Sequence, residues 1–159
     1  MKRNIVFRQI DDEIENKLFE MYGEWLYEHD VIPKHDGSYN VAALCDGDIA
    51  GFAAMTPKKW TKPLDMYNDM FITGIEVMEK YRKQGIGRRL VEMLENHAKE
   101  NGYRQIRAWS SEDKIAALNM WYSMNYAMCP AHETFLNEDG TLRKIVLGYK
   151  YAKMLNKGI

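Results

Sequence analysis

Cysteine is scarce in this chain of 159 residues, which contains only Cys45 and Cys129. Two isolated cysteines provide neither a disulfide framework nor the paired Cys-x-x-Cys spacing of a zinc site. Cys129 is followed closely by His132 and Glu133, but there is no second pair of ligands, so an ordinary strand edge is the preferred interpretation. We therefore expect no metal, and we expect a reducing, cytoplasmic environment.

Long apolar runs and an excess of either charge are also missing. The first apolar run covers only residues 5–7, which is too short for a signal peptide, and no segment approaches the length of a membrane span. The chain has 22 Lys and Arg against 23 Asp and Glu, for a formal net charge of -1, with both signs interspersed. We therefore expect neither a membrane nor a nucleic acid as a partner.

One stretch, residues 72–91, carries the clearest functional signal. It begins as a β-branched run, passes through a basic turn that contains Gly85 and Gly87, and takes up a helical apolar spacing from Leu90 onward. The two glycines allow close approach of the backbone, and the first N–H groups of a helix have no internal acceptor. Because such a helix start favours phosphate oxygens, the stretch predicts a site for a small phosphorylated ligand.

Two common phosphate motifs fit this stretch poorly. A dinucleotide fingerprint requires a small residue where Leu90 stands, and a Walker loop requires Gly-Lys-Ser/Thr where two arginines follow Gly87. The stretch instead resembles motif A of the GNAT superfamily of N-acetyltransferases, Gln/Arg-x-x-Gly-x-Gly/Ala, which here reads Arg82-Lys83-Gln84-Gly85-Ile86-Gly87.

The resemblance implies that acetyl-CoA is the co-substrate and lies between the central strand and the strand near residues 104–110. Its pyrophosphate would rest on residues 82–88, and a backbone N–H of Val77 or Met78 would polarise the thioester carbonyl. The implied cofactor-binding residues are Val77, Met78, Arg82, Lys83, Gln84, Gly85, Ile86, Gly87 and Arg88.

The rest of the chain predicts one domain, residues 1–159, without linkers or repeats. We expect a helix that begins near Asp11, has Ile14, Leu18, Met21, Trp25 and Leu26 on its inner face, and leads into a loop over residues 30–38. Trp25 packs in the core or lines an acceptor pocket. A hairpin joins residues 39–44 and 49–55 through a Gly47 turn. Residues 56–63 are expected to be a basic turn region.

Further along, the motif helix is expected to end at residues 101–102, followed by a strand over residues 105–110. Ser110 or Ser111 would open the next helix, and a hairpin would flank residues 137–140. The resemblance therefore predicts an α/β (α+β) GNAT-like acyl-CoA N-acyltransferase fold: a mixed, largely antiparallel sheet of about six to seven strands flanked by about four helices.

Candidate catalytic residues follow from the chemistry of acetyl transfer. An amine with a pKa of about 10.4 must lose a proton before it attacks. Some family members place a glutamate where this chain has Thr73. Glu76 is the nearest carboxylate on the strand and is the candidate base, with Asp69 in reserve. The alternative for Glu76 is a solvent-facing or salt-bridged glutamate. Asp69 is otherwise a solvated surface acid or helps to hold a cationic amine.

The family often protonates the departing thiolate with a tyrosine in the pattern Ala-x-x-Leu-Tyr-x-x-x-Gly-Phe. The matching segment, residues 117–126, places Trp121 at the tyrosine position and Tyr122 one residue later. An indole is not a usable acid. Either the helix end shifts so that Tyr122 reaches the sulfur, which we prefer, or the thiolate leaves unassisted.

The sequence thus predicts an acetyl-CoA-dependent N-acetyltransferase that acts on a primary amine of a small molecule or peptide. The alternative is a catalytically silent GNAT-fold module that binds acyl-CoA, motivated by Thr73 and Trp121 at two positions of family chemistry. Members of this family often form homodimers.

Overall fold

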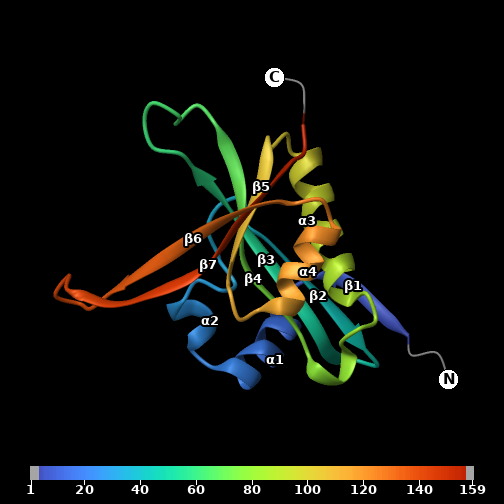
Figure 1. Cartoon of the computed structure of the whole chain (residues 1–159). Coiled ribbons are helices and arrows are strands. Elements are labelled where there is room, and N and C mark those ends of the chain that lie inside the picture. The colour runs from blue at the N-terminus through green and yellow to red at the C-terminus, as the bar shows by residue number, and fades with distance from the viewer. Residues whose placement is uncertain (1–3, 157–159) are drawn as a thin grey trace.

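The computed structural model describes residues 4–156, which form a seven-stranded sheet with helices on both faces (Figure 1). The strands are β1 (Ile5–Gln9), β2 (Tyr39–Cys45), β3 (Asp48–Lys59), β4 (Asn68–Val77), β5 (Gln105–Ser111), β6 (Ala127–Leu136) and β7 (Leu142–Met154). The helices are α1 (Asp12–Tyr22), α2 (Trp25–Glu28), α3 (Ile86–Glu100) and α4 (Ile115–Ser123), with a short 3-10 helix η1 (Glu79–Tyr81).

The strand order is β1-β2-β3-β4-β5-β7-β6, and every neighbouring pair is antiparallel except β4 and β5. The predicted fold class, a mixed and largely antiparallel sheet with helices on both sides, is confirmed.

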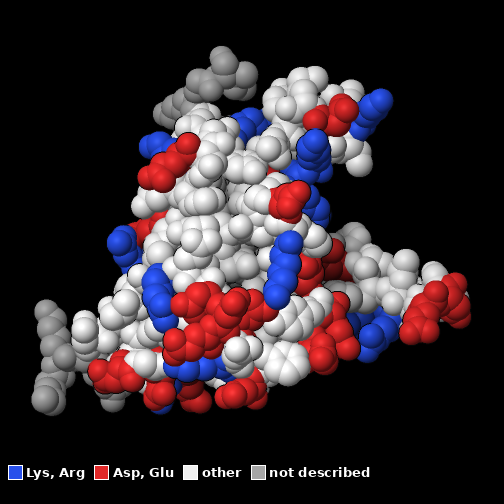
Figure 2. Space-filling model, turned by 180° about the vertical axis from the view of Figure 1, so that it is seen from behind, with Lys and Arg blue, Asp and Glu red and all other residues white. Residues whose placement is uncertain are grey.

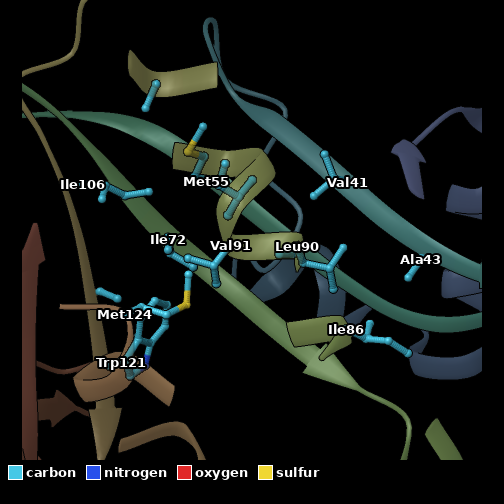
Figure 3. Packing of buried hydrophobic residues seen from close by; sticks show 14 of the residues in the cluster. Val41, Ala43, Met55, Ile72, Ile86, Leu90, Val91, Ile106, Trp121 and Met124 are labelled. Carbon is cyan, nitrogen blue, oxygen red and sulfur yellow. The ribbon is translucent and has the colours of Figure 1, made fainter. Parts of the chain in front are cut away.

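Alternate residues of the central strands point into two separate apolar clusters. In β2, Val41 and Ala43 face the cluster under α3, whereas Ala42 and Leu44 face the cluster that contains α1 and α2. Figure 3 shows side chains of α3 and α4 above the sheet in the larger cluster. Because a buried side chain of this kind contributes about 1.5–3 kcal/mol, the two clusters fix both helical layers on the sheet.

The β2–β3 hairpin and the start of α1 follow their predicted local signals. Asp46 and Gly47 both have positive φ, at 52° and 86°, as a tight hairpin turn requires. Asp11 is the N-cap of α1, and its Oδ1 accepts a hydrogen bond of 3.0 Å from the backbone N–H of Ile14.

The first predicted helix is interrupted. α1 ends at Gly23, where φ is 64°, and α2 begins two residues later. Ile14, Leu18 and Leu26 are buried as expected, but Met21 and Trp25 are exposed. The expectation that Trp25 packs in the core is therefore wrong, because the break at Gly23 turns α2 relative to the apolar stripe of α1.

Two further local predictions require correction. Residues 56–59 continue β3 instead of forming a turn. Beyond Met55 the strand pairs with β4 alone, so it has a free edge there, and Pro57, which has no N–H to donate, is tolerated. α4 begins at Ile115, after the predicted start, because the Ser111 hydroxyl donates to Asp113 and caps no helix.

The β6–β7 hairpin is longer than predicted and projects from the body of the molecule (Figure 1). Among residues 4–156, none of the helices combines the length and the apolar character that a membrane span requires.

Candidate active site

The parallel strands β4 and β5 separate soon after they meet, and this opening is the centre of the candidate site. They pair only at Met70 with Ile106 and at Phe71 with Arg107. A bulge in β4 follows immediately, because Ala54 pairs with Gly74 and Met55 with Ile72, which leaves Thr73 without a partner in β3. An extra residue bends a strand and increases its twist. The second half of β4 is therefore paired with β3 alone.

The bulge also determines which side chains face which layer. Before it, Met70 and Ile72 belong to the cluster under α3; after it, Ile75 and Val77 pack against that cluster. Glu76 consequently lies on the face of α1 and α2. The site thus has an α3/α4 side and an α1/α2 side, separated by β4.

The hydrogen bonds of β4 leave one backbone edge open. The N–H of Met78 donates to the carbonyl of Ala50 at 2.9 Å. Because bonding alternates along an antiparallel pair, the N–H groups of Ile75 and Val77 point away from β3, toward the opening. Of the two predicted oxyanion donors, Met78 already has an acceptor in β3 and Val77 faces the opening.

The glycine loop leads into an uncapped helix start beside this edge. Lys83 and Gly85 have φ of 60° and 77°, and Gly85 is the N-cap of α3. α3 has neither a side-chain cap nor an acidic residue in its first turn, in contrast to α1. A Cβ on Gly87 would lie 3.2 Å from Sδ of Met120, so this glycine permits close packing of α4 on α3. The free amides and the positive end of the helix dipole can bind an anion.

The side chains of the loop play different parts. Arg82 is exposed, and its Nε donates to the carbonyl of Val77 at 3.0 Å, which ties the loop to the end of β4. Lys83 and Gln84 are exposed, whereas Ile86 is buried, so only the main chain of Ile86 is available to a ligand. Arg88 donates to Oγ of Ser123 at 3.0 Å and so links α3 to the end of α4.

Residues 117–126 adopt the register that places Trp121 at the family tyrosine position. Asn125 follows the end of α4 with φ of 65°, the left-handed conformation that favours glycine, so it stands where the family pattern has Gly. Trp121 is 1% exposed and packs between Tyr126 and Tyr151, whereas Tyr122 is 75% exposed. The expected shift of the helix end does not occur, and most of the Tyr122 side chain faces solvent.

Glu76 lies next to α1 on the other side of the sheet. Its Oε1 is 3.4 Å from Nη2 of Arg82, and both side chains are partly exposed. Burial raises the pKa of the Tyr22 hydroxyl, and the charge of Glu76 raises it further, which places these two groups near each other. Thr73, at the position of the family glutamate, donates instead to the carbonyl of Val31 at 3.1 Å.

Asp69 is unsuited to the role of reserve base and is not a solvated surface acid. It is 0% exposed and accepts hydrogen bonds from Gln105 at 2.8 Å and from Nε1 of Trp60. Arg107 lies 3.1 Å and Arg104 3.5 Å from its carboxylate. This buried group joins the beginnings of β4 and β5 below the opening. No pattern in the sequence indicates this group, because its partners Arg104 and Gln105 lie 35 and 36 residues away along the chain.

Two grooves flank the α1/α2 side of β4. One, of about 440 Å³, contains an ion pair of 2.8 Å between His35 Nε2 and Asp30 that sequence reasoning did not identify. Its lining residues are His29, Asp30, His35, Thr56, Pro57, Lys58, Phe71 and Thr73. The other, of about 640 Å³, is lined by Met21, Asp48, Ile49, Met78, Glu79 and Lys80.

The helical segment over these grooves is strongly acidic. Figure 2 shows acidic side chains gathered at the lower end of the molecule, the end at which Figure 1 places α1 and α2. Between residues 11 and 30 the acids are Asp11, Asp12, Glu13, Glu15, Glu20, Glu24, Glu28 and Asp30, against the single lysine Lys17. Within residues 4–156 no three His, Cys, Asp or Glu side chains form a group that could hold a metal ion.

Comparison with known proteins agrees with this geometry. Residues 5–126 match the acetyltransferase (GNAT) family. The chain therefore belongs to the acetyltransferase (GNAT) family.

Among characterised proteins, the chain is similar to streptothricin acetyltransferase from Streptomyces lavendulae, with 33% identity over 89 residues; the match covers 56% of this chain and 44% of that protein. The match thus spans less than half the length of this relative.

Solved structures share the fold. Arabidopsis thaliana NAA60 in complex with acetyl-CoA superposes with a TM-score of 0.71 at 15% identity, covering 96% of this chain and 99% of that one. The ribosomal-protein-S18-alanine N-acetyltransferase from Escherichia coli gives a TM-score of 0.72 at 13% identity, covering 98% of this chain and 97% of that one.

Proposed function

We propose that this chain, as a single domain, binds acetyl-CoA in the opening between β4 and β5 and transfers the acetyl group to a primary amine of a small molecule or peptide. The observation that carries the proposal is the uncapped start of α3 next to the unpaired edge of β4. The amides from Gly85 to Arg88 would hold the diphosphate, and Arg82 would supply a nearby positive charge. The backbone of Ile75 and Val77 would pair with the pantetheine.

The same edge supports a mechanism of direct transfer. The Val77 N–H, with no partner in β3, would donate to the oxygen that becomes negative when the amine attacks the thioester carbon. Glu76 lies on the α1/α2 side, where an acceptor can enter along either groove, and we assign it the role of accepting the amine proton directly or through water. The carbon–sulfur bond then breaks and its electron pair leaves with sulfur.

A small cationic amine is the acceptor that we favour. The acidic α1–α2 segment would attract a positive charge, and the exposed Trp25 offers an aromatic face beside it. The similarity to streptothricin acetyltransferase supports the same class of acceptor. The family match and these features favour turnover over a silent acyl-CoA-binding module.

Release of the coenzyme thiol tests this proposal. Purified chain with acetyl-CoA is supplied in turn with streptothricin, polyamines, aminoglycosides and peptides, and the thiol is measured with a chromogenic disulfide. We expect amine-dependent release with at least one cationic small molecule. Tight binding of CoA without release for any amine would instead support the silent module.

A further inference from the structure

Two buried hydrogen-bond donors near the opening between β4 and β5 have no acceptor. Within residues 4–156, Nε1–H of Trp121 in α4 and the hydroxyl of Tyr151 in β7 make no hydrogen bond, although each residue is only 1% exposed. The centroids of the two rings are 5.5 Å apart. Buried polar groups in folded proteins are nearly always hydrogen-bonded. Two adjacent donors without acceptors therefore indicate that a bound ligand provides the acceptor atom.

Tyr151 lies beside the part of β5 that no longer pairs with β4. Tyr151 lies opposite Ala108, one residue beyond the last contact between β5 and β4 at Arg107. Burial raises the pKa of Tyr151, against a smaller lowering by the nearby Ser110 hydroxyl, which forms no well-aligned hydrogen bond with it. The phenol therefore keeps its proton at neutral pH and remains a donor.

Trp121 lies on the α3 side of the same opening. In Figure 3 its side chain lies with Met124 near Val91 of α3 and Ile72 of β4. The preceding residue, Met120, packs against Gly87 at the start of α3. The indole donor and the predicted diphosphate site therefore border one opening.

We propose that Trp121 and Tyr151 form a two-donor site for the sulfur of the coenzyme. This inference rests on the proposed binding of acetyl-CoA between β4 and β5. When the amine nitrogen bonds to the carbonyl carbon, the carbon–sulfur bond breaks and the electron pair moves to sulfur. The indole N–H and the phenol O–H donate hydrogen bonds to the resulting thiolate without losing their protons. The amine proton goes to the base, and the thiolate takes a proton from water after release.

The pH dependence of coenzyme affinity tests this site independently of turnover. Affinities for CoA and for desulfo-CoA, in which hydrogen replaces the thiol, are measured by calorimetry between pH 7 and pH 9.5. A free thiol has a pKa of about 8.5, and hydrogen bonds to charged groups are strong, so we expect wild-type affinity for CoA to rise by about tenfold relative to desulfo-CoA across this range.

Trp121→Phe and Tyr151→Phe should each reduce this rise several-fold, and the double variant should abolish it, with little change for desulfo-CoA. Trp121→Tyr should retain it because the phenol restores a donor. Trp109→Phe is the matched control. The Nε1 of Trp109 is also buried without a partner, but Trp109 follows Ala108 in β5, so its side chain points to the opposite face of the strand.

An unchanged rise in both Phe variants, or no rise in the wild type, would overturn the inference. A wild-type chain that binds neither compound would instead contradict the proposed function. If circular dichroism shows that Trp121→Phe is unfolded, Tyr151→Phe and Trp121→Tyr still decide the result.

Discussion

The backbone N–H of Met78 donates to the carbonyl of Ala50 at 2.9 Å, and this bond determines which backbone N–H groups at the end of β4 face the opening. It fixes the alternation of the ladder, so that Val77 presents its N–H to the opening. The proposed oxyanion donor is therefore a main-chain group that no substitution at Val77 except proline removes. The site is therefore tested by substitutions in the glycine loop, at neighbouring side chains or at residues that stabilise the fold.

A negative charge at the start of α3 should weaken coenzyme binding. Gly85→Asp is expected to reduce acetyl-CoA affinity by about tenfold or more, because it sets a carboxylate against the diphosphate and the helix dipole. Gly102→Asp, at the other end of α3, is a matched control: both glycines have φ of 77° and open space where a Cβ would be added. Calorimetric titration compares them. Equal loss in both variants would show that backbone strain, and not charge, is responsible.

Removal of the Glu76 carboxylate should slow transfer without impairing coenzyme binding. Glu76→Gln is expected to lower kcat by about 100-fold or more at neutral pH, the range of general base catalysis, with acetyl-CoA affinity nearly unchanged. Glu92→Gln is the control, since Glu92 forms only a surface pair of 3.5 Å with Arg89. Steady-state kinetics with a saturating amine measures the effect. A kcat close to the wild-type value would assign the proton transfer to another group.

Asp69 should matter for stability because its loss leaves two arginines without their buried counterion. Asp69→Ala is expected to lower the free energy of unfolding by about 3–5 kcal/mol, as is typical when one partner of a buried ion pair is removed. Surface pairs are worth about 0–1 kcal/mol, so Glu92→Gln should have little effect here too. Urea denaturation measures both. A loss below about 1 kcal/mol for Asp69→Ala would contradict the structural role given to this group.

His97 should make stability fall in mild acid. Its ring stacks on Tyr39 with centroids 3.8 Å apart, and burial lowers its pKa below the ordinary value of 6.5, partly offset by Glu100. The neutral ring is thus favoured in the folded state, so its contribution is present above pH 6.5 and is lost as the pH falls through the lowered pKa.

His97→Phe keeps an aromatic ring but cannot take up a proton, so its stability should decline less than that of the wild type between pH 6.5 and pH 5. Urea denaturation at several pH values measures the difference. Parallel curves for the two proteins would assign the decline to other groups.

Local signals in the sequence predicted those parts of the fold that depend on neighbouring residues. The turn at Asp46 and Gly47, the start of α1 near Asp11 and the end of α3 near Gly102 need only a few residues to define their geometry, and all were confirmed. The predicted turn over residues 56–63 was wrong for residues 56–59, which continue β3, because the extent of this strand depends on its pairing with β4.

Features of the site that join distant segments could not be predicted in the same way. The Asp69 group unites residues from the beginnings of two strands, and no periodic pattern indicates such a contact. The resemblance identified the glycine loop and placed Trp121 in the correct register, but only packing shows that Trp121 is buried and Tyr122 exposed. The assignment of catalytic roles to Glu76 and Tyr122 remains a prediction.

The extra residue at Thr73 decides which side of the sheet each later residue of β4 faces. If Thr73 instead took a regular place in the ladder, Glu76 and Val77 would exchange sides of the sheet. The carboxylate would then lie among apolar side chains under α3, and the valine would face the acceptor. The bulge, more than the identity of any one side chain in it, therefore keeps Glu76 on the α1/α2 side.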